Sequence, residues 1–551
     1  MSAIPQDAPS KLSLEGSDPA DFPVRQRLRE ALLLVGFCLF LFFYGLGQFG
    51  LVGADEPRYA QVAREMLQRH DWITPTLGGK PWLEKPPLYY WQAMIAYRIF
   101  GVSDWAARLP SAVDASLIVL AVYMFLRKLR PGFLVDGALI TASVAGILGF
   151  ARSASTDMPL AAMFSLALLS WYAWWETSRK LYLSAFYVFV ALAALAKGPI
   201  APALAGVVIL FFALAAGDVR ILLRTLWLPG LALFILVALP WYIAIQTRQP
   251  EFFRIFILEH NFARFGSNLY HHEQPFWFYL PVAALALVPW SVFVAAALFE
   301  TVRGWWAERA TLFQSSDALS FFLLLWLVVP IFFFSLSHSK LPGYIMPAIP
   351  AGPLLVTEYV RRHVDDPPST GLNTLHALLA SAILVPAFNV AYLVLQHRLP
   401  LGRGLVVASV IALIVAIGIA ITLAGKLRLR LLYFVTLVPV VLAVASLIRI
   451  GSPMIDQTLS ARPVARQLSS MEMKPLPVAV LGVRRETEFG LAFYRNQTIS
   501  RYEISGVPEG EHLLVTPAGA RNVVAKLTGN RRVSFLGDFA AQNLDFYWIG
   551  K

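Results

Sequence analysis

The sequence predicts a polytopic α-helical membrane protein with a small soluble α/β domain at its C-terminal end. The first observation is composition: 57% of the 551 residues are hydrophobic and only 15% are charged, which is more apolar surface than a soluble fold can hide. The second is that apolar stretches of membrane-spanning length recur between residues 31 and 448. The third is a change of composition after residue 450, where short apolar runs replace the long ones.

The membrane helices are predicted from windows of about twenty residues, and about thirteen windows qualify as transmembrane helices. The shorter stretch 88–101 contains Gln92 and Arg98, so we expect an amphipathic helix lying in the membrane interface. The predicted spans are 31–50, 107–126, 133–150, 158–175, 181–196, 201–216, 227–245, 276–299, 319–336, 344–359, 375–395, 405–424 and 431–448.

The distribution of basic residues orients these spans. If the polar tail 1–30 is cytoplasmic, every cytoplasmic turn is basic, as the positive-inside rule requires. The membrane domain 31–450 then carries a long first loop, 51–105, on the non-cytoplasmic side, and the region 451–551 also falls outside. The basic turns are 127–130, 178–180, 220–224, 303–309, 361–362 and 426–430.

The C-terminal region 451–551 is predicted to be an α/β domain on the outer membrane face. Its apolar runs 478–483, 513–516, 533–536 and 546–549 have the length of strands. Helix-compatible stretches, 486–494 and 518–527, alternate with them. Such alternation favours helices packed on a sheet.

Charge and cysteine content exclude other classes. The formal charge of +12 comes mainly from basic residues beside apolar spans, so we expect no nucleic-acid partner. The single cysteine, Cys38, lies inside the first span and excludes an internal disulfide or a cysteine-based zinc site. We expect a monomer.

The first loop is longer than a connection requires, and long loops are usually functional. Directly after the first span come Asp55, Glu56, Arg58 and Tyr59. Asp55 is expected to be the N-cap of a helix that begins at Glu56. A capping acid on a solvated helix and a catalytic acid are equally compatible with this pattern.

The same loop contains Glu84 and Lys85 before two prolines. Because a residue before proline favours extended backbone, we expect the Lys85 ammonium to be held on a stiff segment. An interfacial belt with a snorkelling lysine would explain the neighbouring aromatic residues but not Glu84.

Further ionisable residues fall on the same predicted membrane face. Asp157 directly precedes the fourth span, at a membrane depth where a carboxylate is costly unless it is paired; an N-cap is the alternative. Together, carboxylates and cations beside apolar helices suit a lipid with an anionic head group and acid–base chemistry. Besides Asp157, the further ionisable residues on this predicted membrane face are Lys197, Arg264, His272, Lys340 and Tyr344.

In their order along the chain, these motifs resemble the GT-C membrane glycosyltransferases, related to the protein mannosyltransferases. They are most similar to the family that transfers 4-amino-4-deoxy-L-arabinose from undecaprenyl phosphate to lipid A, a modification linked to polymyxin resistance. The resemblance covers about Asp55 to Pro347. It is carried by Asp55-Glu56-x-Arg58-Tyr59, Arg64-Glu65-Met66, Asp71-Trp72, Glu84-Lys85-Pro86, Asp157, Lys197-Gly198, Glu259-His260-x-x-Arg264-Phe265, His272-x-x-Pro275 and Lys340-Leu341-Pro342-x-Tyr344.

The resemblance implies transfer to lipid A phosphates on the periplasmic face of the bacterial inner membrane. It implies catalytic roles for Asp55, Asp157 and Lys85, and no required cofactor. If a divalent metal such as zinc is present, Glu84 and His272 are the residues expected to hold it. The residues expected to bind the lipid phosphate and substrate are Arg58, Tyr59, Lys85, Arg264, Lys340 and Tyr344.

Three other functions are weighed against this one. A protein O-mannosyltransferase would use the same type of donor but would need a general base to activate a hydroxyl acceptor. A transporter or flippase of lipid-linked sugars would place ionisable residues near the membrane midplane and break helices in corresponding halves, which the sequence does not suggest. A membrane scaffold would leave the acid-and-cation cluster unexplained.

Overall fold

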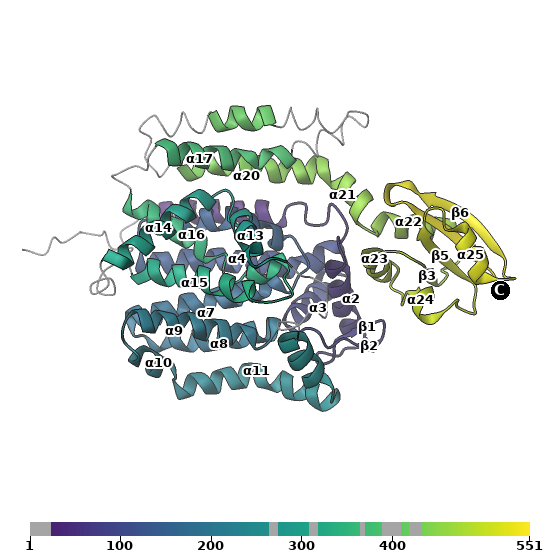
Figure 1. The fold of residues 1–551 in the computed structure, drawn as a ribbon, viewed down its shortest axis with the longest axis horizontal. Coiled ribbons are helices and arrows are strands. Elements are labelled where there is room, and N and C mark those ends of the chain that lie inside the picture. Colours follow the sequence, from purple (N-terminus) through teal and green to yellow (C-terminus); the bar gives the residue numbers. More distant parts are fainter. Residues whose placement is uncertain (1–23, 264–273, 308–317, 364–369, 388–408, 418–431) are drawn as a thin grey trace, which may run out of the picture.

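The computed structural model describes residues 24–263, 274–307, 318–363, 370–387, 409–417 and 432–551. Most of these residues form a stack of helices that run side by side (Figure 1), and a mixed α/β unit lies at one end of the stack. Around that end also lie helices α2 (Asp55–Gln68) and α3 (Leu88–Phe100). We call this end of the stack the α2 face.

Seven helices in the described part of the chain are long and apolar enough to cross a membrane, or nine if two bent pairs each count as one span. Predicted spans 375–395, 405–424 and 431–448 extend into residues outside the description. The helices of the stack are α1 (Val24–Cys38) with η1 (Leu39–Phe43), α4 (Asp104–Leu129), α5 (Leu134–Ser143), α6 (Ala145–Ala151), α7 (Asp157–Thr177), α8 (Lys180–Lys197), α9 (Ile200–Ala215), α11 (Leu228–Arg248), α13 (Tyr279–Ala286), α14 (Ser291–Ala307), α15 (Ala318–Ser335), α16 (Ala351–Arg362), α17 (Thr370–Ala382) and α20 (Leu432–Ser446).

Two of the predicted spans are broken. Helices α5 and α6 meet at 65°, and α13 and α14 at 116°. At the first break Val144 adopts an extended conformation, and at the second Pro289 lies between the helices, where it cannot donate a helical hydrogen bond. Each of the predicted spans 133–150 and 276–299 therefore consists of two helices that meet at an angle.

The end of the stack away from the α2 face gathers basic residues and carboxylates. Arg130, after α4, lies 3.0 Å from Glu176 of α7 and 3.8 Å from Glu358 of α16. Glu358 also pairs with Arg361 at 2.8 Å. The predicted basic turns 127–130, 178–180 and 361–362 thus lie at one end of the stack, as a common membrane side requires.

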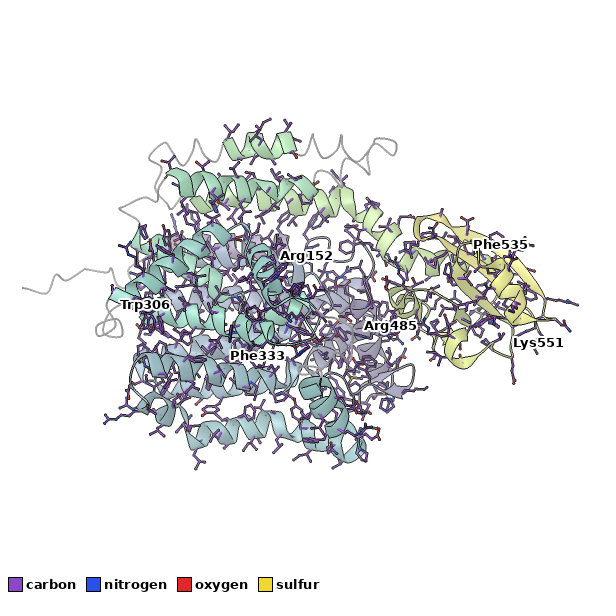
Figure 2. The ribbon with its side chains drawn as sticks, viewed as in Figure 1. Arg152, Trp306, Phe333, Arg485, Phe535 and Lys551 are labelled. Carbon is purple, nitrogen blue, oxygen red and sulfur yellow. The ribbon has the colours of Figure 1, made fainter. Side chains whose placement is uncertain are left out.

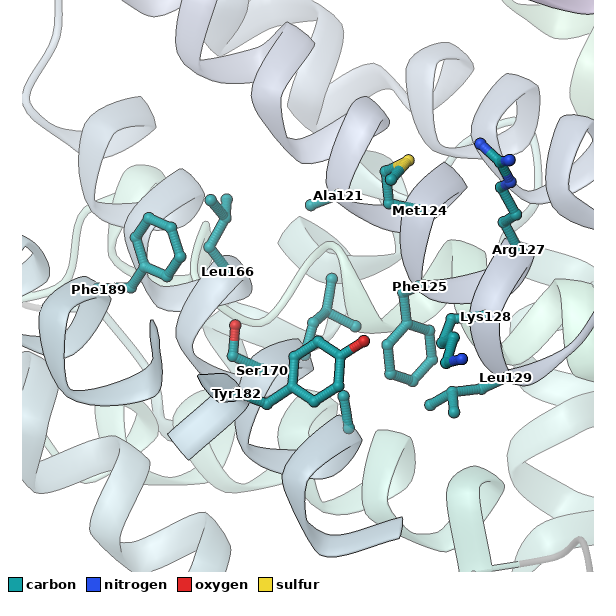
Figure 3. A pocket seen from close by; sticks show the side chains of 12 residues that line it. Ala121, Met124, Phe125, Arg127, Lys128, Leu129, Leu166, Ser170, Tyr182 and Phe189 are labelled. Atoms are coloured by element: carbon teal, nitrogen blue, oxygen red, sulfur yellow. The ribbon is translucent and has the colours of Figure 1, made fainter. Parts of the chain in front are cut away.

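A cavity of about 440 Å³ lies near these turns, between α4, α7 and α8 (Figure 3). Its wall is mostly apolar, with Arg127 and Lys128 at α4 and Ser170 on α7. Ser170 is about 20 Å along α7 from Asp157, given the helical rise per residue. This cavity is therefore remote from the predicted site residues.

The first loop folds into helices and a short hairpin at the α2 face. Strands β1 (Thr76–Leu77) and β2 (Lys80–Pro81) pair antiparallel, and Gly78 and Gly79 between them both have positive φ, which glycine adopts without strain. Helix α3 packs between α2 and α4, while its Ile95, Ile99 and Phe100 are exposed. An exposed apolar strip fits the predicted interfacial helix.

The C-terminal unit is a five-stranded sheet in the order β4-β3-β5-β7-β6. Strand β3 pairs parallel with β4 and β5, whereas β7 pairs antiparallel with β5 and β6. Its elements are β3 (Val478–Val480), α23 (Arg485–Arg495), β4 (Ser500–Arg501), α24 (Tyr502–Ser505), β5 (His512–Pro517), α25 (Arg521–Thr528), β6 (Val533–Phe539) and β7 (Leu544–Ile549), preceded by α21 (Ser452–Leu459) and α22 (Arg462–Met471).

Four of these strands coincide with the predicted apolar runs, and α23 and α25 with the predicted helices. Strand β4 was not predicted, because two polar residues carry no apolar pattern. Figure 2 shows Arg485 on the side of the unit that faces the helices, and Phe535 and Lys551 on its far side.

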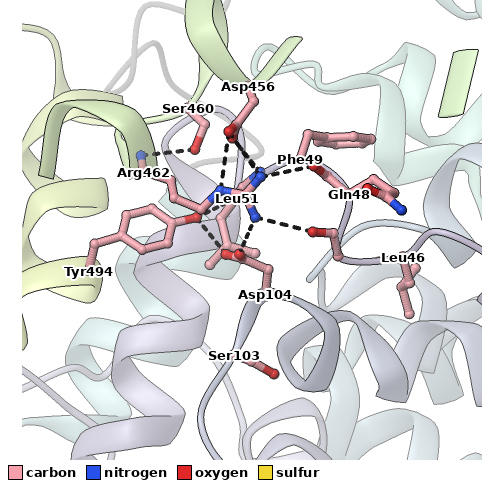
Figure 4. Close-up of polar contacts among 12 residues, drawn as sticks. Leu46, Gln48, Phe49, Leu51, Ser103, Asp104, Asp456, Ser460, Arg462 and Tyr494 are labelled. Atoms are coloured by element: carbon pink, nitrogen blue, oxygen red, sulfur yellow. Dashed lines mark hydrogen bonds and ion pairs between the residues drawn. The ribbon is translucent and has the colours of Figure 1, made fainter. Parts of the chain in front are cut away.

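Polar contacts join the C-terminal unit to the segment that leads from the first span into α2 (Figure 4). The Arg462 guanidinium donates to the carbonyl oxygens of Gly47 and Gln48, at 3.1 and 2.9 Å, and pairs with Asp104 of α4 at 2.9 Å. The Tyr494 hydroxyl donates to Asp104 at 2.5 Å and accepts the Leu51 amide at 2.6 Å. The junction thus fixes the backbone just before Asp55.

Candidate functional site

A buried ion pair anchors the candidate site. Glu56 on α2 and Arg108 on α4 are 4% and 0% exposed. The Arg108 Nε and Nη2 atoms donate to the two Glu56 carboxylate oxygens at 3.0 and 2.7 Å. Such a bidentate pair fixes geometry as well as charge.

The Glu56 carboxylate also binds two segments of backbone. It accepts the amide of Val52 at 2.8 Å and the amide of Ala154 at 2.7 Å. Val52 shortly precedes Asp55, and Ala154 shortly precedes Asp157. One buried carboxylate therefore ties together the two segments that carry the predicted catalytic acids.

Asp55 is the first residue of α2 and forms an ion pair with Arg58 one turn later. The predicted N-cap is wrong: Ala54 occupies that position, without a side-chain cap. The Asp55 side chain is 58% exposed, whereas that of Arg58 is 14% exposed. The Asp55 carboxylate is thus accessible to an incoming molecule, whereas most of the Arg58 side chain is buried.

Aromatic rings surround the Arg58 guanidinium. Its Cζ atom lies 5.0 Å from the ring centroid of Trp82, 5.2 Å from that of Tyr59 and 5.7 Å from that of Phe489 on α23. These distances are typical of cation–π contacts. The C-terminal unit therefore contributes a side chain to this cluster.

The Nε atom of Arg58 is buried and has no hydrogen-bond partner among the described residues. Burial lowers the pKa of the guanidinium, but Tyr59, Asp55 and Glu84 raise it, and the net pKa lies above its ordinary value. A buried charged donor without a partner is costly, so the Nε atom of Arg58 is suited to an anion that completes its hydrogen bonds.

Tyr59 connects the two acids electrostatically. Burial first, and then the carboxylate of Asp55, raise the pKa of its hydroxyl; the charge of Arg58 lowers it, and that of Asp157 raises it further. The net pKa is well above the ordinary value, so the hydroxyl stays protonated at neutral pH and can donate a hydrogen bond.

The second acid has its own cation. Asp157, the first residue of α7, pairs with Lys197 at the end of α8 and accepts the Ser155 hydroxyl at 3.0 Å. Lys197 also lies 4.8 Å from the ring centroid of Tyr344. Asp157 thus makes an ion pair rather than the alternative N-cap contact, and no cap bond forms at Thr156.

The Lys340–Tyr344 segment packs directly on this pair. A methyl group built on Gly343 would lie 2.7 Å from the Asp157 Oδ2 atom. The absence of a side chain at Gly343 therefore allows the turn to approach the carboxylate. This contact explains how the motif around Tyr344 reaches a residue so distant in sequence.

Glu84 and Lys85 lie in a bend before α3 and are half-buried. The Glu84 carboxylate is close enough to raise the pKa of Arg58, which places it beside the first acid and cation. Lys85 is adjacent to it in the chain. The role of Lys85 as a catalytic residue and phosphate ligand stays a prediction.

Lys340 is 6% exposed. Its ammonium donates to the carbonyl oxygens of Gln274, at 3.0 Å, and Ser337, and burial lowers its pKa below the ordinary value. It lines a cavity of about 440 Å³ together with His338 and Phe276. Both hydrogen bonds go to main-chain carbonyl oxygens, so neither joins Lys340 to the carboxylate of Asp55 or Asp157.

Arg264 and His272 lie outside the described residues. Within the described ranges, no three or more His, Cys, Asp or Glu side chains gather as a metal site would require. Glu84 itself lies near the Arg58 charge. The zinc site of Glu84 and His272 stays a prediction.

Two contributors to the cluster, Arg108 and Phe489, were not among the predicted site residues, and Lys197 was predicted only as a cation of the outer face. Lys197 and Arg108 are charges at the edges of apolar spans, which is a known mark of function or pairing in a membrane helix. Phe489 had no sequence indication, because its contact depends on how a distant unit docks.

The arrangement can bind an anion and act on a neighbouring group. Two carboxylates each have a cation, and the cluster includes a protonated tyrosine and a guanidinium donor that has no partner among the described residues. Cations aimed at a developing negative charge stabilise the departure of a phosphate, and an exposed carboxylate can orient a nucleophile or a cationic substituent.

A family model described as dolichyl-phosphate-mannose-protein mannosyltransferase matches residues 84–243. Among curated proteins, two undecaprenyl phosphate-alpha-4-amino-4-deoxy-L-arabinose arabinosyl transferases are similar to this chain. The one from Pseudomonas aeruginosa (strain UCBPP-PA14) is 36% identical over 331 residues, covering 59% of this chain and 58% of the relative. The one from Pseudomonas paraeruginosa is 34% identical over 379 residues, covering 68% and 67%.

The chain thus spans 58% and 67% of the length of these two relatives. The crystal structure of ArnT from Cupriavidus metallidurans bound to undecaprenyl phosphate aligns with a TM-score of 0.74 at 21% identity, over 94% of this chain and 97% of that one. Its apo form aligns with a TM-score of 0.73 at 20% identity, over 95% and 98%. This chain has the same fold, that of a polytopic GT-C membrane protein.

Proposed function

This chain belongs to the family of undecaprenyl phosphate-alpha-4-amino-4-deoxy-L-arabinose arabinosyl transferases, and from this premise we propose that it is a membrane glycosyltransferase that moves 4-amino-4-deoxy-L-arabinose from undecaprenyl phosphate to a phosphate of lipid A. The reaction would occur on the periplasmic face of the inner membrane. The observation that carries the proposal is the Arg58 guanidinium, whose buried Nε donor has no partner among the described residues and lies beside the exposed Asp55.

In the proposed reaction a phosphate oxygen of lipid A forms a bond to the anomeric carbon of the sugar. The bond from that carbon to the phosphate of undecaprenyl phosphate breaks, and the electron pair leaves with the phosphate. Arg58 and Lys85 would stabilise the charge that develops on this leaving group, with Arg264, Lys340 and Tyr344 as further contacts.

The acceptor decides what Asp55 does. A phosphate is already an anion and needs no general base, unlike a serine or threonine hydroxyl. Asp55 would therefore orient the acceptor or the sugar ammonium rather than remove a proton. Asp157, which is paired with Lys197, would bind the ammonium of the sugar.

The proposed enzyme acts as a monomer and needs no cofactor, because protein cations carry the role that a metal has with pyrophosphate donors. Elemental analysis of the purified protein tests directly whether a metal is bound. Stoichiometric zinc that is lost together with activity on chelation would contradict it and would favour Glu84 and His272 as ligands.

Mass spectra of lipid A provide the decisive experiment. A strain lacking the gene, complemented with the wild type, should gain lipid A carrying aminoarabinose, and Asp55→Ala should abolish the gain. Asp55→Asn should lower transfer about 100-fold or more, because orientation of the reacting groups is lost. Undiminished transfer by Asp55→Asn would remove Asp55 from the mechanism.

A protein O-mannosyltransferase is the second candidate, and the family-model match over 84–243 favours it. It predicts mannose on serine or threonine of a periplasmic protein and unmodified lipid A. The same strains distinguish the two functions when their glycoproteins and lipid A are analysed together.

A further inference from the structure

A cavity of about 480 Å³ lies where the C-terminal unit meets the membrane part. Its wall comes from three places: Arg64 on α2, the turn at Val102–Asp104 before α4, and α22 with α23 of the C-terminal unit. Both parts of the molecule are therefore needed to form it. Arg64 lies about 9 Å along α2 from Arg58.

Three guanidinium groups converge on this cavity. Arg462 and Arg466, one turn apart on α22, share a helix face with Ser469. Arg64, on α2 of the membrane part, also lines the cavity. The only carboxylate that lines the cavity among the described residues is Asp104, and Arg462 is paired both with it and with Asp456, each at 2.9 Å. The positive charge of the described lining that no carboxylate balances is therefore that of Arg64 and Arg466.

Two of these arginines lack an anionic partner. Arg466 is exposed and makes no hydrogen bond or ion pair with any residue in the described ranges. Arg64 donates from Nη1 to the Phe493 carbonyl oxygen at 2.7 Å, while its buried Nε has no described hydrogen-bond partner. Burial lowers the pKa of Arg64, as expected where no carboxylate compensates for desolvation.

Beside the cavity lies the exposed apolar strip of α3. Ile95, Ile99 and Phe100 are between 50% and 65% exposed, and Val102 at the cavity rim is 40% exposed. A cationic pocket next to an apolar surface matches an amphiphile with a phosphate head and acyl chains. Arginine is suited to the phosphate because its planar fork donates two parallel hydrogen bonds.

We propose that Arg64 and Arg466, beside the paired Arg462, form a second phosphate-binding site, which holds the phosphate of the lipid A acceptor that is not being glycosylated. The inference rests on the proposed function, since it assigns this site to the acceptor of that reaction. Lipid A carries two phosphates, so one would lie near Asp55 and Arg58 while the other lies in the junction cavity. The C-terminal unit would thereby select bisphosphorylated acceptors.

The test compares bisphosphoryl with monophosphoryl lipid A, using the purified full chain in nanodiscs of zwitterionic lipid. For the wild type, the KM for the bisphosphoryl acceptor should be about tenfold lower. Arg466→Gln should raise that KM to the value of the monophosphoryl acceptor and leave the KM of the monophosphoryl acceptor and of the donor unchanged. Because Arg466 is exposed and makes no hydrogen bond or ion pair within the described ranges, this variant should fold normally.

Arg64→Gln, from the membrane part, should have the same selective effect. Lys551→Gln removes a cation from the far side of the C-terminal unit (Figure 2) and should change neither KM. Equal KM values for the two acceptors in the wild type would overturn the proposal. So would a rise in KM that Arg466→Gln causes equally for both acceptors.

Two further arms separate the sources of a phosphate. If the site held a bilayer phospholipid instead, adding phosphatidylglycerol would change activity through Arg466 without regard to the second acceptor phosphate, and the proposal would be overturned. Binding of lipid A without donor separates failure of the site from failure of the function. If the wild type binds the bisphosphoryl form selectively, through Arg466, but transfers no sugar, the proposed function is contradicted while the second phosphate-binding site is supported.

Discussion

At the scale of single residues, the site depends on how Arg58 is held. The two rings at 5.0 and 5.7 Å, Trp82 and Phe489, come from the first loop and the C-terminal unit. Arg58 and Trp82 lie in a charged, aromatic loop that the sequence marks as functional. Phe489 is 431 residues away from Arg58, and no local pattern can reveal such a partner. The sequence therefore allows Arg58 to be predicted as a phosphate ligand, but it does not reveal the ring of Phe489 that lies over the guanidinium.

The first prediction concerns Phe489. Phe489→Leu keeps an apolar side chain but removes the ring, so the kcat/KM for the lipid-linked donor should fall about 3- to 30-fold, the range expected for a partly desolvated cation–π contact. Phe489→Trp should retain most activity. Phe535→Leu, on the far side of the same unit (Figure 2), is the control. Equal losses in Phe489→Leu and Phe489→Trp would show that packing rather than the ring face matters.

At the scale of elements, two contacts hold the acids together. One is the Glu56–Arg108 pair that joins α2 to α4, and the other is the turn at Gly343 that packs on the start of α7. Arg108 is recognisable in the sequence as a charge at the edge of an apolar span, but its partner is not. The bends at Val144 and Pro289 were also not predictable from hydropathy, because average hydropathy measures length and polarity rather than direction.

The second prediction concerns Glu56. Glu56→Gln leaves the fully buried Arg108 without a counter-charge, which should cost about 3–5 kcal/mol of unfolding free energy. Chemical denaturation in detergent measures this loss. Adding Arg108→Met should cost much less than the sum of the single substitutions, since the two residues form one interaction. Additive losses would mean that the two side chains do not interact in the folded protein.

The third prediction concerns Gly343. In Gly343→Ala the new methyl group would lie 2.7 Å from the Asp157 Oδ2 atom and 2.9 Å from its Cγ atom, so the carboxylate or the turn must shift. Transfer should fall about tenfold or more through misplacement of Asp157, with little change in melting temperature.

The matched control is Gly206→Ala in α9, where a methyl group meets nothing within 4 Å. Alanine is also the better helix former, so this variant should be as active and at least as stable as the wild type. Wild-type transfer by Gly343→Ala would show that the Asp157 position tolerates movement and would weaken its proposed role.

At the scale of the whole molecule, hydropathy and charge predict the class of fold, and four apolar runs predict four strands of the C-terminal sheet. The same information does not predict how that sheet docks. The docking contacts of Arg462 and Tyr494 are made to main-chain groups and to Asp104, so they depend on packing between distant segments. The junction cavity, and with it the proposed acceptor site, forms only because the C-terminal unit docks against the membrane part.

The last prediction tests the membrane orientation on which the function depends. Replacing the single cysteine by Cys38→Ser gives a background in which one new cysteine reports its side of the membrane. Ser534→Cys lies on an exposed strand of the C-terminal unit, and Ser178→Cys lies in an exposed basic turn at the opposite end of the stack. Because basic turns are retained in the cytoplasm, a membrane-impermeant maleimide should label Ser534→Cys in intact spheroplasts and Ser178→Cys only after lysis. The reverse pattern would place the acids and cations of the α2 face in the cytoplasm, and a periplasmic transfer to lipid A would then be impossible.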